Sequence, residues 1–254
     1  MISNKTGRLR NVIRAVGCLA GIFISVLMAV RCYGDPPSPP SFKVIRVKNL
    51  ADDAKVESLL ETSDPSDSNS RYKIGSVEKQ RDGKEWLMVN GQKVFEGYSL
   101  SPACSASDGT IVVSSFSDLH NQMNGDGSQF VVDKKTSKFT ITTSSIWIID
   151  ASGAKRKITP DTMHATHPVI SRDGHWLAYT GQALNDKGVP SDQQVYVVSV
   201  QNGVASAPVS LNLQSKGEII PVKWDRGDQL VVLTTEDENS STYQLTWVRM
   251  GMGS

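Results

Sequence analysis

The sequence is poor in cysteine, with three residues in 254, and two of them, Cys18 and Cys32, lie in the first 34 residues. If that segment is removed, Cys104 stands alone and no intramolecular disulfide can form, so packing must hold the fold together. No histidine or second cysteine lies near Cys104 in the sequence. This favours an inert, buried side chain on a strand.

Familiar catalytic motifs are also missing. The chain contains no GxSxG, HExxH, P-loop or GxGxxG pattern, so the common serine-hydrolase, zinc-protease and nucleotide-binding classes have no support. We therefore predict that the protein is not an enzyme and carries no cofactor. A carbohydrate-active or other hydrolase with dispersed carboxylates is the alternative, because such acids need not be close in sequence.

The chain has no basic excess outside its first residues. Residues 1–34 hold five of the 27 basic side chains and no acid, which leaves 22 basic against 26 acidic side chains in the remainder. A body with a small negative balance lacks the basic field that grips a phosphate backbone. Nucleic acid is therefore excluded as the expected partner.

The first 34 residues have the pattern of a targeting segment, in which basic residues up to Arg14 precede the apolar run Ala15–Val30. At about 1.5 Å per residue this run is shorter than the hydrocarbon core of a bilayer, which favours a signal peptide cleaved after Gly34. A retained inner-membrane anchor is the alternative. Both predict a body outside the cytoplasm: periplasmic or secreted after cleavage, or anchored and facing the periplasm.

The body is expected to be all-β. Residues 35–41 form a proline-rich linker, and residues 42–254 contain short runs of Val, Ile, Thr, Trp and Tyr separated by Asn-Gly, Ser-Gly and Asp-Gly pairs, which are strand and hairpin signals. Only Ala51–Glu61 has helical spacing.

Three segments repeat one order: an apolar strand, a glycine turn, a further strand, then a second glycine turn and an apolar strand. They start at Glu85, Ile146 and Gln194, and their two turn glycines are 18, 21 and 24 residues apart (Gly91 to Gly109, Gly153 to Gly174, Gly203 to Gly227). Such units bury their apolar faces against one another, as in a propeller.

Residues 146–180 carry the motif Asp150-Ala-Ser-Gly153, then Pro168-Val-Ile-Ser-Arg-Asp-Gly174 and Trp176-Leu-Ala-Tyr179. This resembles the TolB-type, or WD40-like, repeat of bacterial periplasmic β-propellers. The resemblance implies a propeller-like domain of about four modules, in a small or incomplete ring. Phe42–Val47 is expected to close the ring beside Tyr243–Arg249, and Ser117–Thr140 is an insertion between the first two copies.

Two clusters have metal-ligand character without a full ligand set. His164 and His167 lie three residues apart, but an extended backbone points such residues to opposite faces. Asn124 and Asp126 belong to a segment like a calcium loop, in which Gln122 replaces the expected first aspartate. We predict no metal site. The acid of the Ser107–Thr110 turn is expected to bind backbone N–H groups of its own turn.

The resemblance implies that the protein is a scaffold for protein–protein interaction in the bacterial cell envelope, with an envelope protein as its partner. The family's working parts are the loops at one end of the ring and the central channel, which point to Ser117–Ser128, Thr159–His167 and Ala183–Asp192. The candidate binding residues there are His164, His167, Asp161, Asn124, Asp126 and Asp186. A homodimer formed by pairing of open edge strands is a further possibility. The five tryptophans are expected to pack between modules.

Overall fold

The computed structural model describes residues 36–50, 75–80, 83–101, 103–116, 130–133, 138–141, 143–185, 190–225, 228–236 and 242–252. The chain divides into two compact units, Met1–Pro36 and Pro37–Ser254, and the described residues lie almost entirely in the second. Regular structure in these ranges is β-strand throughout. None of them contains a helix long and apolar enough to cross a membrane. The apolar run Ala15–Val30 and the helical pattern Ala51–Glu61 lie outside the described residues.

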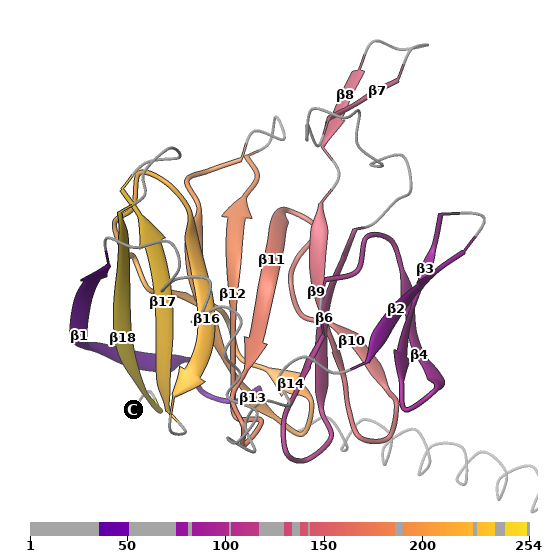
Figure 1. Ribbon diagram of the computed structural model, residues 1–254, viewed down its shortest axis with the longest axis horizontal. Helices are drawn as coiled ribbons and strands as arrows, with labels where there is room; N and C mark the ends of the chain where they lie inside the picture. The colour runs from indigo at the N-terminus through magenta and orange to yellow at the C-terminus, as the bar shows by residue number, and fades with distance from the viewer. Residues whose placement is uncertain are drawn as a thin grey trace, which may run out of the picture. The chain divides into compact units, whose positions relative to one another are not determined.

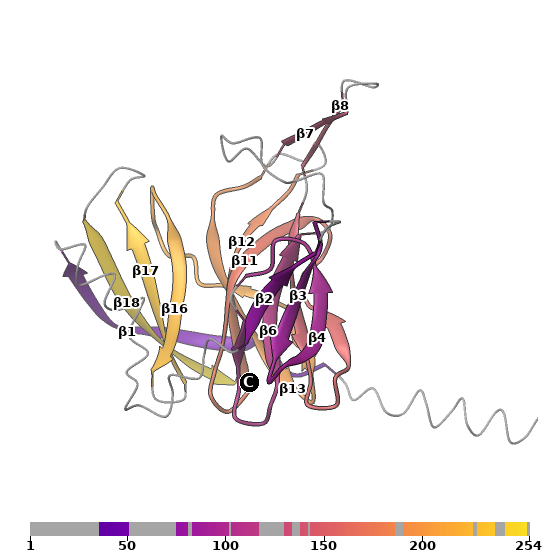
Figure 2. The same cartoon turned by 45° about the vertical axis from the view of Figure 1, so that its right-hand side comes forward.

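The described strands form four antiparallel sheets of three or more strands and one separate hairpin, which confirms an all-β, propeller-like fold of about four modules (Figures 1 and 2). The first sheet is β2 (Ser76–Lys79), β3 (Glu85–Val89) and β4 (Gln92–Gly97). The second has the order β10 (Lys155–Lys157), β9 (Ser144–Ile149), β6 (Ile111–Phe116) and β5 (Cys104–Ser105).

The third sheet has the order β11 (Met163–Ile170), β12 (Trp176–Ala183), β13 (Gln194–Gln201) and β14 (Val204–Ala205), and β15 (Val209–Ser210) also pairs with β13. The fourth has the order β1 (Pro40–Leu50), β18 (Tyr243–Met252), β17 (Gln229–Thr235) and β16 (Ile219–Asp225). A separate hairpin consists of β7 (Phe130–Asp133) and β8 (Lys138–Ile141). This hairpin lies within the predicted insertion between β6 and β9, which pair directly with each other.

The first described strand completes the last sheet. β1 pairs with β18 along its whole length, from Pro40 opposite Met252 to Leu50 opposite Tyr243. This confirms the predicted pairing of Phe42–Val47 with the C-terminal strand. β1 starts inside the proline-rich segment, because a proline is tolerated as the first residue of an edge strand.

The sequence repeat and the sheets are out of phase, which corrects the simple reading of one repeat as one module. The copy that starts at Glu85 supplies β3 and β4 to the first sheet and then β5 and β6 to the second. The other two copies are divided in the same way. Each repeat therefore joins two neighbouring sheets, because the chain must cross from one sheet to the next inside the unit that carries the pattern.

Five of the six predicted turn glycines have the conformation that the turns require, and the sixth, Gly227, lies outside the described residues. Gly91, Gly109, Gly153, Gly174 and Gly203 all have φ between +70° and +88°, the left-handed region that glycine enters without a Cβ clash. The hairpins with Asn90 and Asn202 before their glycines have two successive positive φ angles, as a type I′ turn needs. The sequence therefore placed these turns correctly.

Acidic side chains accept hydrogen bonds from backbone N–H groups in two of these turns. Asp108 accepts hydrogen bonds from the Thr110 N–H at 2.8 Å and from the Thr110 hydroxyl at 3.0 Å. Asp150 accepts from the N–H groups of Ser152 and Ala154 at 2.9 and 3.0 Å. The prediction that the turn acid binds its own turn is confirmed, so these carboxylates serve the fold.

Three buried clusters join consecutive sheets. Leu87, Phe95 and Val113 belong to the cluster between the first and second sheets. A second cluster, which includes Val112, Ile148, Leu177 and Tyr179, joins the second and third sheets. A third joins the third and fourth sheets and contains Trp176 and Trp224. A fourth cluster around Leu233 involves the fourth sheet alone, so among the described residues no buried cluster joins the fourth sheet to the first.

Cys104 and the tryptophans lie largely as predicted. Cys104 is buried on β5, its thiol donates to the Pro168 carbonyl at 3.3 Å, and burial raises its pKa to about 12. Trp176 and Trp224 pack between the third and fourth sheets, whereas Trp86 and Trp247 are half-buried, with Lys93 and Arg46 over their rings.

Candidate functional site

The two ends of the sheets differ in their connections. The tight turns around Gly109, Gly153, Gly174 and Gly203 form one end, which we call the turn end. At the other end, which we call the loop end, longer segments connect the strands (Figure 1). The start of β11 pairs there with the end of β12, and β16 and β18 begin beside the end of β17.

Hydrogen bonds tie the loop-end connections of neighbouring sheets together. The Leu184 N–H donates to the Thr162 carbonyl at 2.7 Å, which joins two of the segments singled out from the sequence. The Ile219 N–H donates to the Gln193 side chain at 3.1 Å, and the Thr180 hydroxyl donates to the Ile219 carbonyl at 2.9 Å. The loop end of the third sheet is thereby fixed to the first residue of β16.

A polar hollow of about 880 Å³ opens between these segments. Its lining residues come from the end of β12, the segment before β13, the segment before β16, and the ends of β17 and β18: Gln182, Ser191, Asp192, Gln193, Ser215, Lys216, Gly217, Glu218, Thr235 and Tyr243. Most of them carry hydrogen-bonding groups, and Tyr243 adds an aromatic ring. The hollow suits an extended polar ligand, because few of its groups are apolar.

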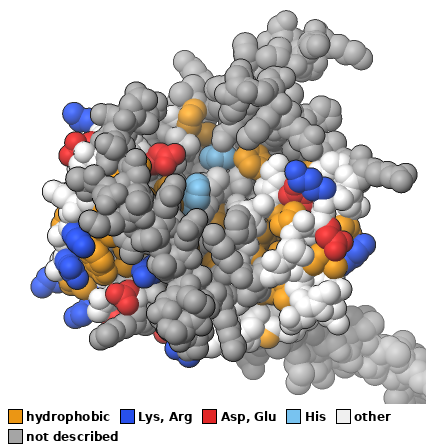
Figure 3. Space-filling view, in the orientation of Figure 1, with side chains coloured by type: hydrophobic (Ala, Val, Ile, Leu, Met, Phe, Trp, Pro, Cys, Tyr) orange, Lys and Arg blue, Asp and Glu red, His pale blue; other side chains and the backbone are white. Residues whose placement is uncertain are grey.

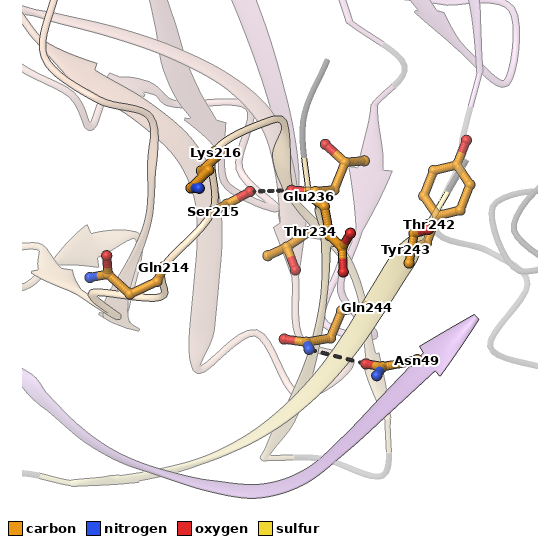
Figure 4. Close-up of a pocket in the computed structure, with 10 residues that line it drawn as sticks. Asn49, Gln214, Ser215, Lys216, Thr234, Glu236, Thr242, Tyr243 and Gln244 are labelled. Carbon is orange, nitrogen blue, oxygen red and sulfur yellow. Dashed lines mark hydrogen bonds between the residues drawn. The ribbon is translucent and has the colours of Figure 1, made fainter. Parts of the chain in front are cut away.

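A second hollow of about 400 Å³ lies beside the first and shares Ser215, Lys216, Thr235 and Tyr243 with it (Figure 4). The Ser215 hydroxyl donates to the Thr235 carbonyl at 2.8 Å, which holds the segment before β16 against β17. On the far side, the Gln244 amide donates to the Asn49 side chain at 3.1 Å. The segment 214–218 is therefore a ridge between two polar hollows.

The two predicted histidines lie in different environments. His164 is 7% exposed on β11, accepts a hydrogen bond at Nδ1 from the Ser144 N–H at 3.1 Å and contacts the Phe116 ring. His167 is exposed and has a φ of +51°, where β11 bulges against β12. Histidine surface is visible near the middle of the face shown in Figure 3.

Burial lowers the pKa of His164, and the charge of His167 acts in the same direction. Although the His167 side chain reaches the surface, the surrounding protein atoms partly desolvate it and lower its pKa, whereas the nearby carboxylate of Glu218 acts to raise it. Both shifts favour the neutral form of the two imidazoles. Within the described ranges no three histidine, cysteine or acidic side chains gather as a metal site would require.

Of the remaining predicted residues, the structure describes only Asp161. Asp161 is exposed at the loop end and forms an ion pair with Lys157. Asn124, Asp126 and Asp186 lie outside the described residues, as does the segment Ser117–Ser128. The sequence reasoning missed Lys216, Glu218 and Glu236, because no motif marks the segment before β16 or the end of β17. The available signal was their position along the third repeat, in which Lys216 and Glu218 precede its third strand and Glu236 directly follows its last one.

Comparison with known proteins shows no family for this chain. No protein-family model matches the sequence, and no curated protein matches it. A gluconolactonase from Xanthomonas campestris is 12% identical with a TM-score of 0.35, over 71% of this chain and 67% of that one. Kuenenia stuttgartiensis hydrazine synthase is 17% identical with a TM-score of 0.31, over 61% of this chain and 48% of that one. A luciferin-regenerating enzyme is 10% identical with a TM-score of 0.22, over 71% of this chain and 78% of that one.

These findings correct one prediction. The missing motifs led us to expect that the protein is not an enzyme, but the gluconolactonase and the luciferin-regenerating enzyme in this comparison are enzymes by name. Dispersed side chains on a sheet scaffold can perform catalysis without a contiguous motif, so the missing motifs do not support that prediction. The propeller-like character of the fold stands, and the TolB-type assignment remains a resemblance in sequence.

Proposed function

We propose that this protein is an extracytoplasmic, propeller-like interaction module of the bacterial envelope that binds a segment of another protein at its loop end. One observation carries the proposal: the polar hollow of about 880 Å³ and its neighbour of about 400 Å³ flank a single ridge, residues 214–218. A continuous polar surface of this kind suits an extended chain more than a compact apolar ligand.

The construction of the ridge supports this proposal. Ser215 bonds the Thr235 carbonyl, and the Glu218 N–H donates to the Thr235 hydroxyl at 2.8 Å. These bonds hold the backbone, while Lys216 and Gln214 remain exposed. A binding surface whose backbone is fixed in advance loses less entropy when the partner docks.

Site-specific photo-crosslinking of the full chain in cells of the source organism tests the proposal. A photoreactive phenylalanine analogue at Gln214 is expected to give one discrete protein adduct, and the same analogue at Ser152, exposed at the turn end, is expected to give none. Lys216→Glu should remove the Gln214 adduct. Equal adducts from both ends, or an adduct indifferent to Lys216→Glu, would contradict the proposal.

A hydrolase is the second candidate, because Asp192 and Glu218 line the same hollow. Most glycosidases use a pair of carboxyl groups that face one cavity. Hydrolysis of a panel of chromogenic glycosides that both Asp192→Asn and Glu218→Gln abolish would favour it over the binding role. Hydrolysis that survives both substitutions would exclude this pair as its catalytic acids.

A further inference from the structure

A second surface lies on the first strand of the second unit, β1, which reaches the smaller hollow only at Asn49. β1 pairs with β18 on one side, and within the described part of the chain no strand pairs with its other side. All side chains from Ser41 to Asn49 are exposed. An open strand edge of this length offers unpaired backbone N–H and C=O groups to an incoming strand.

The exposed apolar side chains of the described ranges concentrate on this strand. Phe42, Val44, Ile45 and Val47 are 37%, 42%, 39% and 52% exposed, and only Val77 joins them among the large exposed apolar residues of those ranges. Single exposed apolar residues need no explanation, but four within six positions of an edge strand form a patch that water solvates poorly.

The two faces of β1 differ in character. Phe42 and Val44 lie opposite Met250 and Val248, and a bulge at Ile45 then keeps Val47 on the same face, opposite Thr246. The other face carries Lys43, Arg46 and Lys48, and residues 40–50 contain no acid. The edge thus has one apolar face and one basic face.

This arrangement opposes pairing with a second copy. An antiparallel pair of two β1 strands that sets Val44 opposite Val47 also sets Lys43 of each copy opposite Lys48 of the other copy. Like charges directly opposite one another destabilise a strand pair, and lysines and bulges on edge strands commonly prevent edge-to-edge association. An acidic strand would convert the same two positions into opposite-charge pairs.

We propose that the free edge of β1 accepts an extended segment of a partner protein as an added strand. The segment carries acids opposite Lys43 and Lys48 and apolar residues opposite Val44 and Val47. Main-chain hydrogen bonds supply the affinity, and the alternating side chains supply the selectivity. These four positions line neither hollow, so the proposal does not depend on the function of the hollows.

The test uses the full chain in detergent micelles and a fluorescent peptide of alternating glutamate and valine. We expect anisotropy to report binding that weakens about tenfold or more in Lys43→Glu/Lys48→Glu. The matched control Lys79→Glu/Lys155→Glu, which changes exposed lysines on two other edge strands, should bind as the unaltered chain does. Near-ultraviolet circular dichroism confirms that each variant is folded.

A second peptide separates strand addition from charge alone. N-methylation of the amides along one edge of the peptide removes its backbone donors, and binding should be lost although the charge is unchanged. Retained binding would overturn the proposal, as would equal binding by a lysine–valine peptide. Peptide-free association of two chains that Val47→Lys abolishes would assign the edge to a second copy. If phosphatidylglycerol vesicles bind through Lys43 and Lys48 and the peptide does not, the edge would be assigned to a membrane. Both of these outcomes also overturn the proposal.

Discussion

The turn end and the loop end of the same four sheets differ in the interactions that hold their backbone. At the turn end, glycines with positive φ and acids such as Asp108 and Asp150 satisfy their own backbone within a few residues. At the loop end, side chains such as Ser215 and Gln193 bond to neighbouring strands and leave polar hollows between them. Local bonds fix the turns and longer-range bonds shape the hollows, so one end maintains the fold and the other is available for binding.

The largest expected contrast lies along strand β12, which connects both ends. Leu177, near the turn end, is fully buried between the second and third sheets, and Leu177→Ala should lower the free energy of unfolding by about 3 kcal/mol through lost burial and a cavity. Gln182→Ala, on the same strand at the loop end, should cost less than about 1 kcal/mol. Urea denaturation measures both, and equal losses would mean that the two ends do not differ as described.

A turn glycine should matter more than a loop-end lysine. Gly174 has a φ of +76°, and an added Cβ would lie 3.2 Å from the Asp108 carboxylate, so Gly174→Ala should cost about 1–2 kcal/mol. Lys216→Ala should change the free energy of unfolding by less than about 0.5 kcal/mol. Thermal denaturation can compare them. A tolerated alanine at Gly174 would show that this turn is not constrained.

The turn end should also respond to acid. Burial alone would raise the pKa of Asp173, but hydrogen bonds from Ser171 and His175 lower it below 3.8. A carboxyl whose folded-state pKa is depressed stabilises the fold above its unfolded pKa and loses that effect as the pH falls through the folded value. Asp173→Asn should therefore cost a few tenths of a kcal/mol near pH 7 and nothing at strongly acidic pH. Urea denaturation at both pH values measures this contribution, and an equal loss at the two pH values would contradict this assignment.

The smallest expected effect is electrostatic and belongs to the loop end. Because the Glu218 carboxylate raises the pKa of His167, Glu218→Gln should lower that pKa further, by less than about one unit. Nuclear magnetic resonance titration of the imidazole protons measures the shift. An unchanged or raised pKa of His167 would show that the two residues do not interact as the structure indicates.

The sequence by itself determined the all-β class, the glycine turns, the burial of Cys104 and the pairing of Phe42–Val47 with the last strand. Each of these depends on local patterns: strand periodicity, the φ that only glycine and asparagine adopt readily, and the small apolar character of an isolated thiol. It could not show that each repeat is divided between two sheets, because the pattern marks strands and turns and does not identify the strands that pair.

Only the tertiary structure decided the site. Lys216 and Glu218 come together with Asp192 because the end of β12, the starts of β13 and β16, and the end of β17 lie at the same place, and no spacing along the chain encodes that meeting. The same is true of the open edge of β1. Its valines read as ordinary core residues in the sequence, and only the pairing of the strand on one side leaves them exposed. Local propensity is a property of neighbouring residues, whereas a binding surface is a property of residues that the packing of sheets brings together.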